Sequence, residues 1–432
     1  MTTKFSTAKI CRNCGSALDS PVLDLGKMPL ANSNVKPENL NRTEPAFPLR
    51  IFFCESCGLV QQLDFVAAED VFDEYQYFSS FSKSWLYHAK RYVETITKRI
   101  GLTEKSQVIE IASNDGYLLQ YFKEKNIPAL GIEPSKTVAE AALAAGIPTR
   151  IQFFNTKTAG DLAGEGLQAD LILGNNVLAH VPDLHDFVEG IRIALKPGGV
   201  LTMEFPHLLR LLEQTQFDTI YHEHFSYFSF TAVERVFARH RITLFDVEEL
   251  PTHGGSLRIY GRHQTNLELP VSANVAALKK REEAAGLHLV RTYLNLAKRV
   301  ERVKEELLRF LKDAKARQMT VVGYGAPAKG NTFLNTCGVG PDLIQYTVDL
   351  SPHKQGLRLP GSHLPIYSPD KIRETKPNYV LILPWNLKDE ITKQMSYISE
   401  WGGKFVTAIP ELRVIEPIAI KESLVGTKAV GV

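Results

Sequence analysis

The chain has 432 residues, of which 44% are hydrophobic and 23% are charged, and its formal net charge at pH 7 is +2. This length is enough for two to four domains with cores of their own, and the nearly balanced charge gives no reason to expect nucleic-acid or membrane partners. The first residues lack the apolar core of a signal peptide, and no stretch has the length of a membrane span. We therefore expect a cytoplasmic protein of several globular domains.

Four of the five cysteines form two CxxC pairs near the N-terminus, Cys11 with Cys14 and Cys54 with Cys57. Two such pairs offer four thiolates to one tetrahedral zinc ion and leave no coordination position open for a substrate. A redox CxxC is the alternative, but redox motifs usually occur singly, at a helix start that follows a strand. The spacing therefore predicts a structural zinc module over residues 1–66, where turn-forming residues are frequent.

Strands and helices alternate in the rest of the chain, which indicates parallel sheets with both faces covered. A helix is expected at 83–99, and one or two long helices at 273–317. The first series of apolar strands is predicted at 108–111, 129–133, 171–173 and 200–204, with a turn at 197–199, and the second at 319–322, 344–349 and 379–383. The predicted fold is α/β, with two Rossmann-like units after the zinc module, at residues 67–270 and 271–432.

A cofactor site is predicted where the first strands of this series end. The turn Ala112-Ser-Asn-Asp-Gly116 departs from GxGxxG, because Ala112 and Asn114 stand where glycines are common, and this argues against a dinucleotide. Glu133 ends the next strand, where it could accept hydrogen bonds from two ribose hydroxyls. This order of features fits S-adenosylmethionine and a class I methyltransferase. The expected cofactor-binding residues are Ala112, Asn114, Asp115, Gly116, Glu133, Asn175 and Asn176.

Histidine, glutamate and tyrosine gather in the segment Tyr221-His-Glu-His-Phe225. Histidine suits proton abstraction near neutral pH, a carboxylate can orient it, and tyrosine can donate a hydrogen bond to an oxyanion. On a regular strand, Tyr221 and Glu223 would face away from His224, so a shared site requires an irregular segment. The alternatives are a metal site at His222 and His224, which lacks a third ligand, and a polar loop without catalysis.

Two further places are candidates for the same site. His180 closes the loop after the third strand, where it could reach both cofactor and substrate. An aromatic cluster that contains Tyr75 and Tyr77 precedes the first sheet, and its alternative roles are core packing or a docking surface.

The turn Gly323-Tyr-Gly-Ala-Pro-Ala-Lys-Gly330 follows a predicted strand in the C-terminal unit. Glycines with free backbone N–H groups and a lysine suit phosphate. The turn is not a Walker A motif, because no Ser or Thr follows Lys329 and a proline intrudes. We expect it to bind the nucleotide end of a substrate, with Lys329 near the pyrophosphate. A second dinucleotide is the alternative, and Asp349 is then a ribose ligand or simply a cap.

These motifs together resemble the sugar C-methyltransferases that act on nucleotide-linked keto-deoxysugars. The resemblance covers nearly the whole chain, and the combination of YHEHF with GYGAPAKG is the specific part of it. The motifs that carry it are the two CxxC pairs, Met28–Asn32, Tyr75–Ser80, Ile111–Gly116, Asn176–Pro182, Tyr221–Phe225, His253–Arg258, Gly323–Gly330, Lys354–Gly356 and Pro360-Gly361.

The resemblance implies an N-terminal zinc module, a central S-adenosylmethionine-dependent methyltransferase domain and a C-terminal Rossmann-like domain. It implies methylation at C-3 of a thymidine-diphosphate (TDP)-linked 4-keto-6-deoxyhexose or a close relative. Separately, we expect the protein to be a monomer or weak dimer. His224 is then the base that forms an enolate, and Tyr221, Glu223, His180 and one of Tyr75 and Tyr77 line the site. The expected substrate-binding residues are Lys329, Tyr324, Arg258 and Asn386.

Three other functions remain as alternatives. An O- or N-methyltransferase would not need an α-proton base such as His224. An NAD-dependent oxidoreductase or epimerase would use the glycine-rich C-terminal turn. A binding protein with an inactive methyltransferase fold would need neither of them.

Overall fold

The computed structural model describes residues 9–63 and 78–417. The chain forms two compact units that do not follow its order. Unit 1 comprises Met1–Lys27, Phe47–Gln216 and Ile220–Arg299, and unit 2 comprises Met28–Ala46, Phe217–Thr219 and Val300–Val432. The segment between the two cysteine pairs therefore contributes to both units.

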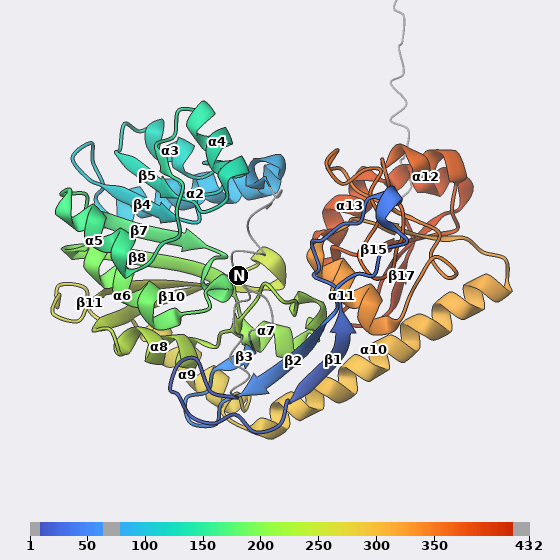
Figure 1. The fold of residues 1–432 in the computed structure, drawn as a ribbon, viewed down its shortest axis with the longest axis horizontal. Coiled ribbons are helices and arrows are strands. Elements are labelled where there is room, and N and C mark those ends of the chain that lie inside the picture. Colours follow the sequence, from blue (N-terminus) through green and yellow to red (C-terminus); the bar gives the residue numbers. More distant parts are fainter. Residues whose placement is uncertain (1–8, 64–77, 418–432) are drawn as a thin grey trace, which may run out of the picture. The chain divides into compact units, whose positions relative to one another are not determined.

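A seven-stranded sheet forms the centre of unit 1 (Figure 1). Its strand order is β10-β11-β8-β7-β4-β5-β6, in which β4 to β8 run parallel and β11 is antiparallel to both of its neighbours. This topology confirms the predicted methyltransferase Rossmann-like fold. The strands are β4 (Val108–Ile111), β5 (Ala129–Ile132), β6 (Thr149–Arg150), β7 (Ala169–Asn175), β8 (Leu195–Pro206), β10 (Ile242–Leu250) and β11 (Ser256–His263).

Helices cover both faces of this sheet, as expected for buried parallel strands (Figure 1). One face packs against α2 (Lys83–Ile100), α3 (Leu119–Lys123) and α4 (Lys136–Ala144). The other face packs against α5 (Thr156–Gly164), α6 (Leu184–Ala194) and α8 (Phe230–Ala238).

Helix α2 shows why the predicted helix forms. Ser82 caps its first turn by accepting a hydrogen bond from the Trp85 N–H, and Gly101 ends it in the left-handed conformation. Ala89, Tyr92 and Ile96, at helical spacing, are buried against the sheet. Unit 1 also contains α7 (Leu208–Glu213) and α9 (Ala273–Ala284), and α10 (Val290–Ala316) runs from unit 1 into unit 2.

The turn expected at 197–199 lies inside β8 instead of before it. The β7–β8 register shifts there, since Ala169 pairs with Leu195 but Leu171 pairs with Val200. The additional residues of β8 form a bulge, which lets the strand begin earlier than the sequence suggests.

A second, four-stranded sheet joins the N-terminal module to the predicted acid–base segment. Its order is β1-β2-β3-β9, and β9 pairs with β3 in antiparallel register, Val60 opposite Tyr227 and Gln61 opposite Ser226. The strands are β1 (Leu23–Met28), β2 (Phe47–Phe53), β3 (Val60–Gln62) and β9 (Ser226–Tyr227). The last strand follows the Tyr221–Phe225 segment directly, so the zinc module fixes one end of that segment.

Unit 2 is built on a six-stranded sheet of order β14-β13-β12-β15-β16-β17, parallel except for β17. β13 is shorter than the predicted strand, because only its two residues pair with strands on both sides. The strands are β12 (Val321–Tyr324), β13 (Thr347–Val348), β14 (Ile366–Tyr367), β15 (Tyr379–Ile382), β16 (Lys404–Thr407) and β17 (Arg413–Ile415), and the helices are α11 (Ala328–Cys337), α12 (Asp370–Thr375) and α13 (Lys388–Gln394).

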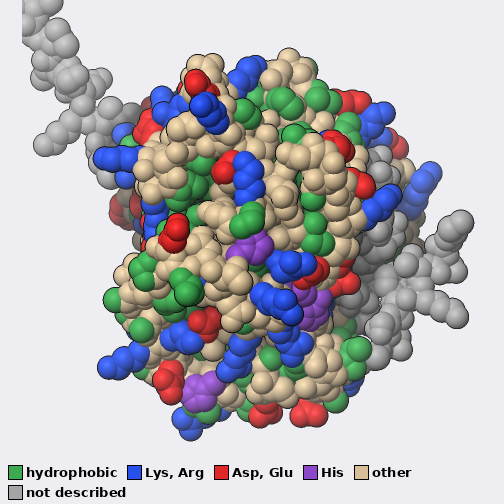
Figure 2. Space-filling view, turned by 90° about the vertical axis from the view of Figure 1, so that its left-hand side faces the viewer, with side chains coloured by type: hydrophobic (Ala, Val, Ile, Leu, Met, Phe, Trp, Pro, Cys, Tyr) green, Lys and Arg blue, Asp and Glu red, His purple; other side chains and the backbone are tan. Residues whose placement is uncertain are grey.

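Short 3-10 turns connect many of these elements. They are η1 (Pro37–Asn39), η2 (Ser79–Phe81), η3 (Leu178–His180), η4 (Phe217–Thr219), η5 (Thr252–Gly254), η6 (Trp385–Leu387) and η7 (Ser396–Trp401). On the face shown in Figure 2, acidic and basic side chains are interspersed, in keeping with the net charge of +2. None of the helices in the described ranges is both long enough and apolar enough to cross a bilayer.

Candidate active site

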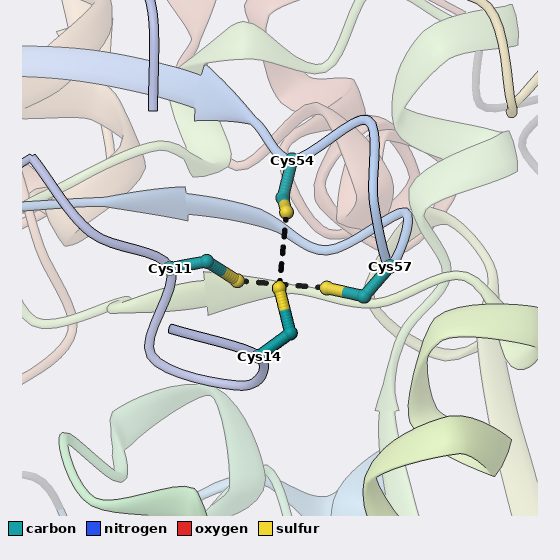
Figure 3. Close-up of side chains that lie close together, drawn as sticks. All are labelled: Cys11, Cys14, Cys54 and Cys57. Carbon is teal, nitrogen blue, oxygen red and sulfur yellow. Dashed lines mark hydrogen bonds between the residues drawn. The ribbon is translucent and has the colours of Figure 1, made fainter. Parts of the chain in front are cut away.

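The four paired cysteines converge on one point (Figure 3). Their Sγ atoms all lie within 4.8 Å of one another, with 3.5 Å between Cys11 and Cys57 and 3.4 Å between Cys14 and Cys54. In each pair a left-handed glycine follows, and its N–H donates to the carbonyl of the first cysteine, which tightens the turn. Four thiolates in this arrangement are the donor set of a closed tetrahedral site. The zinc ion is therefore structural.

The predicted cofactor turn lies at the carboxyl ends of β4 and β5. Ala112 and Asn114 are both in the left-handed conformation, with φ of 57° and 51°. Such backbone is costly for alanine and is concentrated at functional sites. The Asn114 N–H donates to Glu133, and its side-chain oxygen accepts from the N–H of Ser79. The turn is thus held from two sides in a conformation that glycine would adopt without strain.

Three carboxylates line this turn. Glu133 accepts backbone hydrogen bonds from Asn114 and Ser135, at 2.9 and 2.8 Å, and Asp115 accepts one from Ser80 at 3.1 Å. Glu110 is fully buried in β4, and within the described part of the chain neither of its oxygens has a hydrogen bond of normal geometry. Burial, and then the charges of Glu133 and Asp115, raise the pKa of Glu110 well above its usual range.

Glu110 was not among the expected cofactor residues. It lies within the apolar run Val108-Ile-Glu-Ile111, and an acid inside a buried strand was the signal that could have identified it. A buried carboxyl with two unsatisfied oxygens, beside two further carboxylates, fits a cationic ligand. S-adenosylmethionine carries a sulfonium and an ammonium group, so the residues present fit this cofactor.

Asn175 and Asn176 complete the predicted cofactor set at the end of β7. Asn175 Nδ2 lies 3.4 Å from the hydroxyl of Tyr117, which follows the cofactor turn. Asn176 is left-handed, with φ of 55°, and its Nδ2 lies 3.1 Å from Nε2 of His253. All seven expected cofactor residues thus lie at or just beyond the carboxyl ends of the neighbouring strands β4, β5 and β7.

Replacing Glu133 with glutamine should weaken S-adenosylmethionine binding about tenfold or more. A glutamine side chain has one acceptor oxygen, so it cannot accept from both the Asn114 and the Ser135 N–H, and it loses the charge that strengthens these bonds. Isothermal titration with the cofactor measures the change. Glu140→Gln, on the exposed face of α4, is the matched control and should bind as the wild type does. Equal affinity of the two variants would contradict the role of Glu133.

The Tyr221–Phe225 segment is irregular, which is the condition that a shared site requires. A turn brings the His224 N–H to the Tyr221 carbonyl at 2.9 Å. The rings of Tyr221 and His224 consequently lie 3.9 Å apart between centroids, and the His180 ring lies 4.7 Å from that of His224. His224 and Glu223 are buried, at 8% and 4% exposure. His180, from a separate part of the chain, thus meets Tyr221 and His224 in one place.

His180 is held in one tautomer. Its Nδ1 lies 2.8 Å from the backbone carbonyl of Glu223, so Nδ1 carries the hydrogen and Nε2 is the acceptor nitrogen of the ring. Burial lowers the pKa of His180 to about 4, because the interior disfavours the charged imidazolium. The ring is therefore neutral at physiological pH and acts as a hydrogen-bonding group.

The metal alternative for this segment gains no support. His222 Nε2 lies 3.2 Å from the carbonyl of Phe47, so this nitrogen donates a hydrogen bond to the backbone. Within the described ranges, the four cysteines are the only group of three or more His, Cys, Asp or Glu side chains that could hold a metal ion.

Tyr75 and Tyr77 lie outside the described residues, and the neighbouring Ser79 and Ser80 contact the cofactor turn through their N–H groups.

Arg258 belongs to a buried ionic network in β11 and β8. Its guanidinium lies 2.6 Å from Glu204, which also contacts His88 and Thr252, both at 2.8 Å. Burial by itself would raise the pKa of Glu204, but the His88 hydrogen bond and the Arg258 charge lower it to about 2. Both Arg258 and Glu204 are at most 5% exposed, so this arginine is bound to a carboxylate of its own chain.

Glu204→Gln should lower the free energy of unfolding of unit 1 by about 3 kcal/mol at pH 7. The pKa of Glu204 is lowered on folding, so its contribution is present above the unfolded value of 4.5 and is lost as pH falls toward 2. The difference between variant and wild type should therefore shrink between pH 5 and pH 3, as followed by urea titration. Glu165→Gln removes an exposed pair with Arg150 and should change little. A pH-independent difference would contradict this account.

The expected substrate residues of unit 2 come from neighbouring strand ends. Tyr324 ends β12, and Lys329 in α11 donates to Asn386 of η6 at 2.9 Å. Lys329 also lies 5.0 Å from the Trp385 ring, and Trp385 donates to Asp218 at 2.7 Å. Burial raises the pKa of Asp218 to about 6, and the Lys329 charge offsets part of this increase. A half-buried lysine and a buried carboxylate therefore lie together in this part of unit 2, and Asp218 was not expected there.

The glycine-rich turn of unit 2 is closed by its own chain. The Ala326 N–H donates to Asp349 at 2.7 Å, and the Ser351 N–H donates to the other oxygen of Asp349 at 2.8 Å. Asp349 thus caps this turn with the same pair of backbone hydrogen bonds that Glu133 makes in unit 1.

Comparison with known proteins extends this description to the whole chain. Family models match at residues 11–72 (zinc binding domain), 85–240 (methyltransferase domain) and 251–410 (C-methyltransferase C-terminal domain). C-methyltransferase NovU of Streptomyces niveus is 35% identical over 405 residues, which cover 94% of this chain and 96% of NovU. Ubiquinone biosynthesis O-methyltransferase of Chelativorans sp. (strain BNC1) is 28% identical over 99 residues, 23% of this chain and 39% of that protein. A solved SAM-dependent methyltransferase from Anabaena variabilis aligns at 16% identity with a TM-score of 0.38, covering 47% of this chain and 98% of that one.

Proposed function

This chain belongs to the S-adenosylmethionine-dependent C-methyltransferases, and from this premise we propose that it methylates C-3 of a TDP-linked 4-keto-6-deoxyhexose. The observation that carries the proposal is the set of rings around His224, because C-methylation next to a ketone needs a base that removes the α-proton, whereas an O- or N-methylation removes no proton from carbon. The likeness to the C-methyltransferase NovU over nearly the full length supports methyl transfer to carbon.

In the proposed mechanism His224 removes the C-3 proton, which is acidic because the C-4 ketone is adjacent. Tyr221, whose ring lies 3.9 Å from that of His224, donates a hydrogen bond to the developing enolate oxygen. Glu223 orients His224, and neutral His180 helps to hold the sugar. Tyr75 or Tyr77 also lines the site in this proposal.

S-adenosylmethionine supplies the methyl group, and Glu110, Asp115 and Glu133 would hold its charged and ribose groups. With the cofactor bound, its methyl group would pass to C-3 of the enolate, where a carbon–carbon bond would form as the carbon–sulfur bond breaks. The protein needs no nucleophile of its own for this step, so the task of the chain is to align the two carbons.

We assign recognition of the nucleotide end to unit 2, through Lys329, Tyr324 and Asn386. Arg258 stays in the proposal as a residue that supports the site through Glu204, because its guanidinium is already bound there.

The three-part division at residues 1–66, 67–270 and 271–432 is proposed as the functional division of the chain. A reducing cytoplasm is the proposed location, since it keeps the four zinc ligands as thiolates.

Incubation with methyl-¹³C-labelled S-adenosylmethionine and a TDP-4-keto-6-deoxyhexose tests the substrate. We expect NMR to show the labelled methyl bonded to C-3, and mass spectrometry to show one added methyl group. The same sugar with the C-4 ketone reduced to an alcohol is the control and should stay unmethylated, because no enolate can form. A methyl group on oxygen or nitrogen, or equal labelling of the reduced sugar, would overturn the proposal.

A further inference from the structure

We propose that Arg12, between the two cysteines of the first zinc-binding pair, is a positioning residue for the acid–base centre. The inference rests on the proposed function, because it takes His224 and His180 as members of one site. Arg12 would hold the two segments that carry these histidines, Asn176–Pro182 and Tyr221–Phe225, at a constant distance from each other. The zinc site would then set the geometry of catalysis without touching the substrate.

The guanidinium of Arg12 binds both segments. Its Nη1 donates to the carbonyl of Pro182 at 2.8 Å, two residues after His180. Its Nη2 donates to the carbonyl of Gln62 at 2.7 Å, and its carbon atom Cζ lies 5.4 Å from the ring centroid of Phe225, the residue after His224. One planar group therefore makes three contacts in three different directions.

Gln62 carries the connection on to the backbone of the acid–base segment. Its N–H donates to the Phe225 carbonyl at 3.1 Å, and its side-chain Nε2 donates to the carbonyls of His222 at 2.5 Å and Tyr221 at 3.3 Å. Gln62 is 1% exposed, so these bonds are shielded from water. Together, Arg12 and Gln62 determine where the turn that carries His224 lies.

The zinc-binding pair is itself anchored to the methyltransferase domain. The Asn13 carbonyl accepts hydrogen bonds from His185 Nε2 at 2.7 Å, on α6, and from Arg239 at 2.5 Å, directly after α8. The Arg12 N–H donates to the side-chain oxygen of Gln61 at 3.0 Å. With Cys11 and Cys14 held by the metal, the backbone on both sides of Arg12 is fixed, so its long side chain starts from a defined position.

Lysine could not replace this arginine. A guanidinium presents several N–H groups in a rigid plane and can stack on an aromatic face while it donates to two carbonyls. An ammonium group carries its three N–H donors at one point on a flexible stem and has no flat face to place over Phe225, so it would not keep all three contacts at once.

The test compares Arg12→Met and Arg12→Lys with Arg50→Met. Arg50 lies on β2 of the same module and forms an exposed pair with Asp24, so it controls for the loss of an arginine from this sheet. We expect both Arg12 variants to lower kcat about 10- to 100-fold with KM nearly unchanged, because small displacements of a catalytic group cost this much. Arg50→Met should keep wild-type kcat. Wild-type kcat in Arg12→Lys would overturn the requirement for a guanidinium.

Zinc content and the histidine rings provide readouts that do not depend on turnover. Zinc per chain should stay at one in all three variants. Long-range ¹H–¹⁵N spectra, assigned with His180→Asn and His224→Asn, should show shifted His180 and His224 signals in Arg12→Met and wild-type signals in Arg50→Met. Unchanged ring signals in Arg12→Met would overturn the inference. If the wild type does not methylate the keto-sugar, the proposed function fails, and the ring signals still decide whether Arg12 positions the histidines.

Discussion

Replacing His224 with asparagine should lower the rate of methyl transfer by about 10²- to 10⁴-fold. Asparagine is similar in size to histidine but cannot accept the C-3 proton near neutral pH. Because His224 is 8% exposed and lies against Tyr221 and His180, no solvent-borne base can easily take its place. The measurement is transfer of labelled methyl at saturating cofactor and keto-sugar.

Deuterium exchange separates the loss of the base from a general loss of the site. In deuterated water without cofactor, the wild type should exchange the C-3 hydrogen of the keto-sugar, and His224→Asn should not. Cofactor affinity should stay near the wild-type value, because the cofactor residues lie at the ends of β4, β5 and β7. His288→Asn, at an exposed position, is the matched control. Normal exchange in His224→Asn would assign the proton abstraction to another group.

The sequence was sufficient to predict features that depend on local pattern. The buried strand Val108–Ile111 is found where the apolar run predicts it, and helix α2 covers the predicted 83–99. The four-cysteine site follows from spacing alone, because each CxxC forms its own tight turn. In these cases the pattern of a few neighbouring residues is enough to predict the element.

Features that depend on tertiary pairing could not be predicted in the same way. The pairing of β3 with β9 joins residues far apart in the chain, and β9 is only two residues long, too short to give a periodic signal. In the sequence, Arg12 is an ordinary charged residue between two cysteines. Its contacts with Pro182 and Gln62 exist only in the folded chain. The charge of Lys329 likewise acts on Asp218 only in the folded unit 2.

Removal of zinc should abolish most methyl transfer while cofactor binding largely remains. Structural zinc sites contribute about 10–16 kcal/mol of apparent binding free energy at pH 7, so the metal-free module should lose its ordered turns. Strand β9 pairs with β3, and Arg12 lies within the first cysteine pair, so the Tyr221–Phe225 segment would lose its support. We expect at least a 100-fold lower rate and cofactor affinity within about threefold, as measured on chelator-treated protein by activity and isothermal titration.

Two cysteine variants separate loss of the metal from side effects of the chelator. Cys54→Ser removes one of the four ligands and should reproduce the metal-free behaviour, with less than one zinc per chain. Cys337→Ser changes the fifth cysteine, which is buried in α11 and belongs to no metal cluster among the described residues, and should keep full zinc and activity. The cofactor edge of the seven-stranded sheet is built from β4, β5 and β7, none of which pairs with the zinc module's sheet. Full activity without zinc would mean that the Tyr221–Phe225 turn is stable by itself, whereas parallel loss of cofactor binding would mean that unit 1 unfolds as a whole.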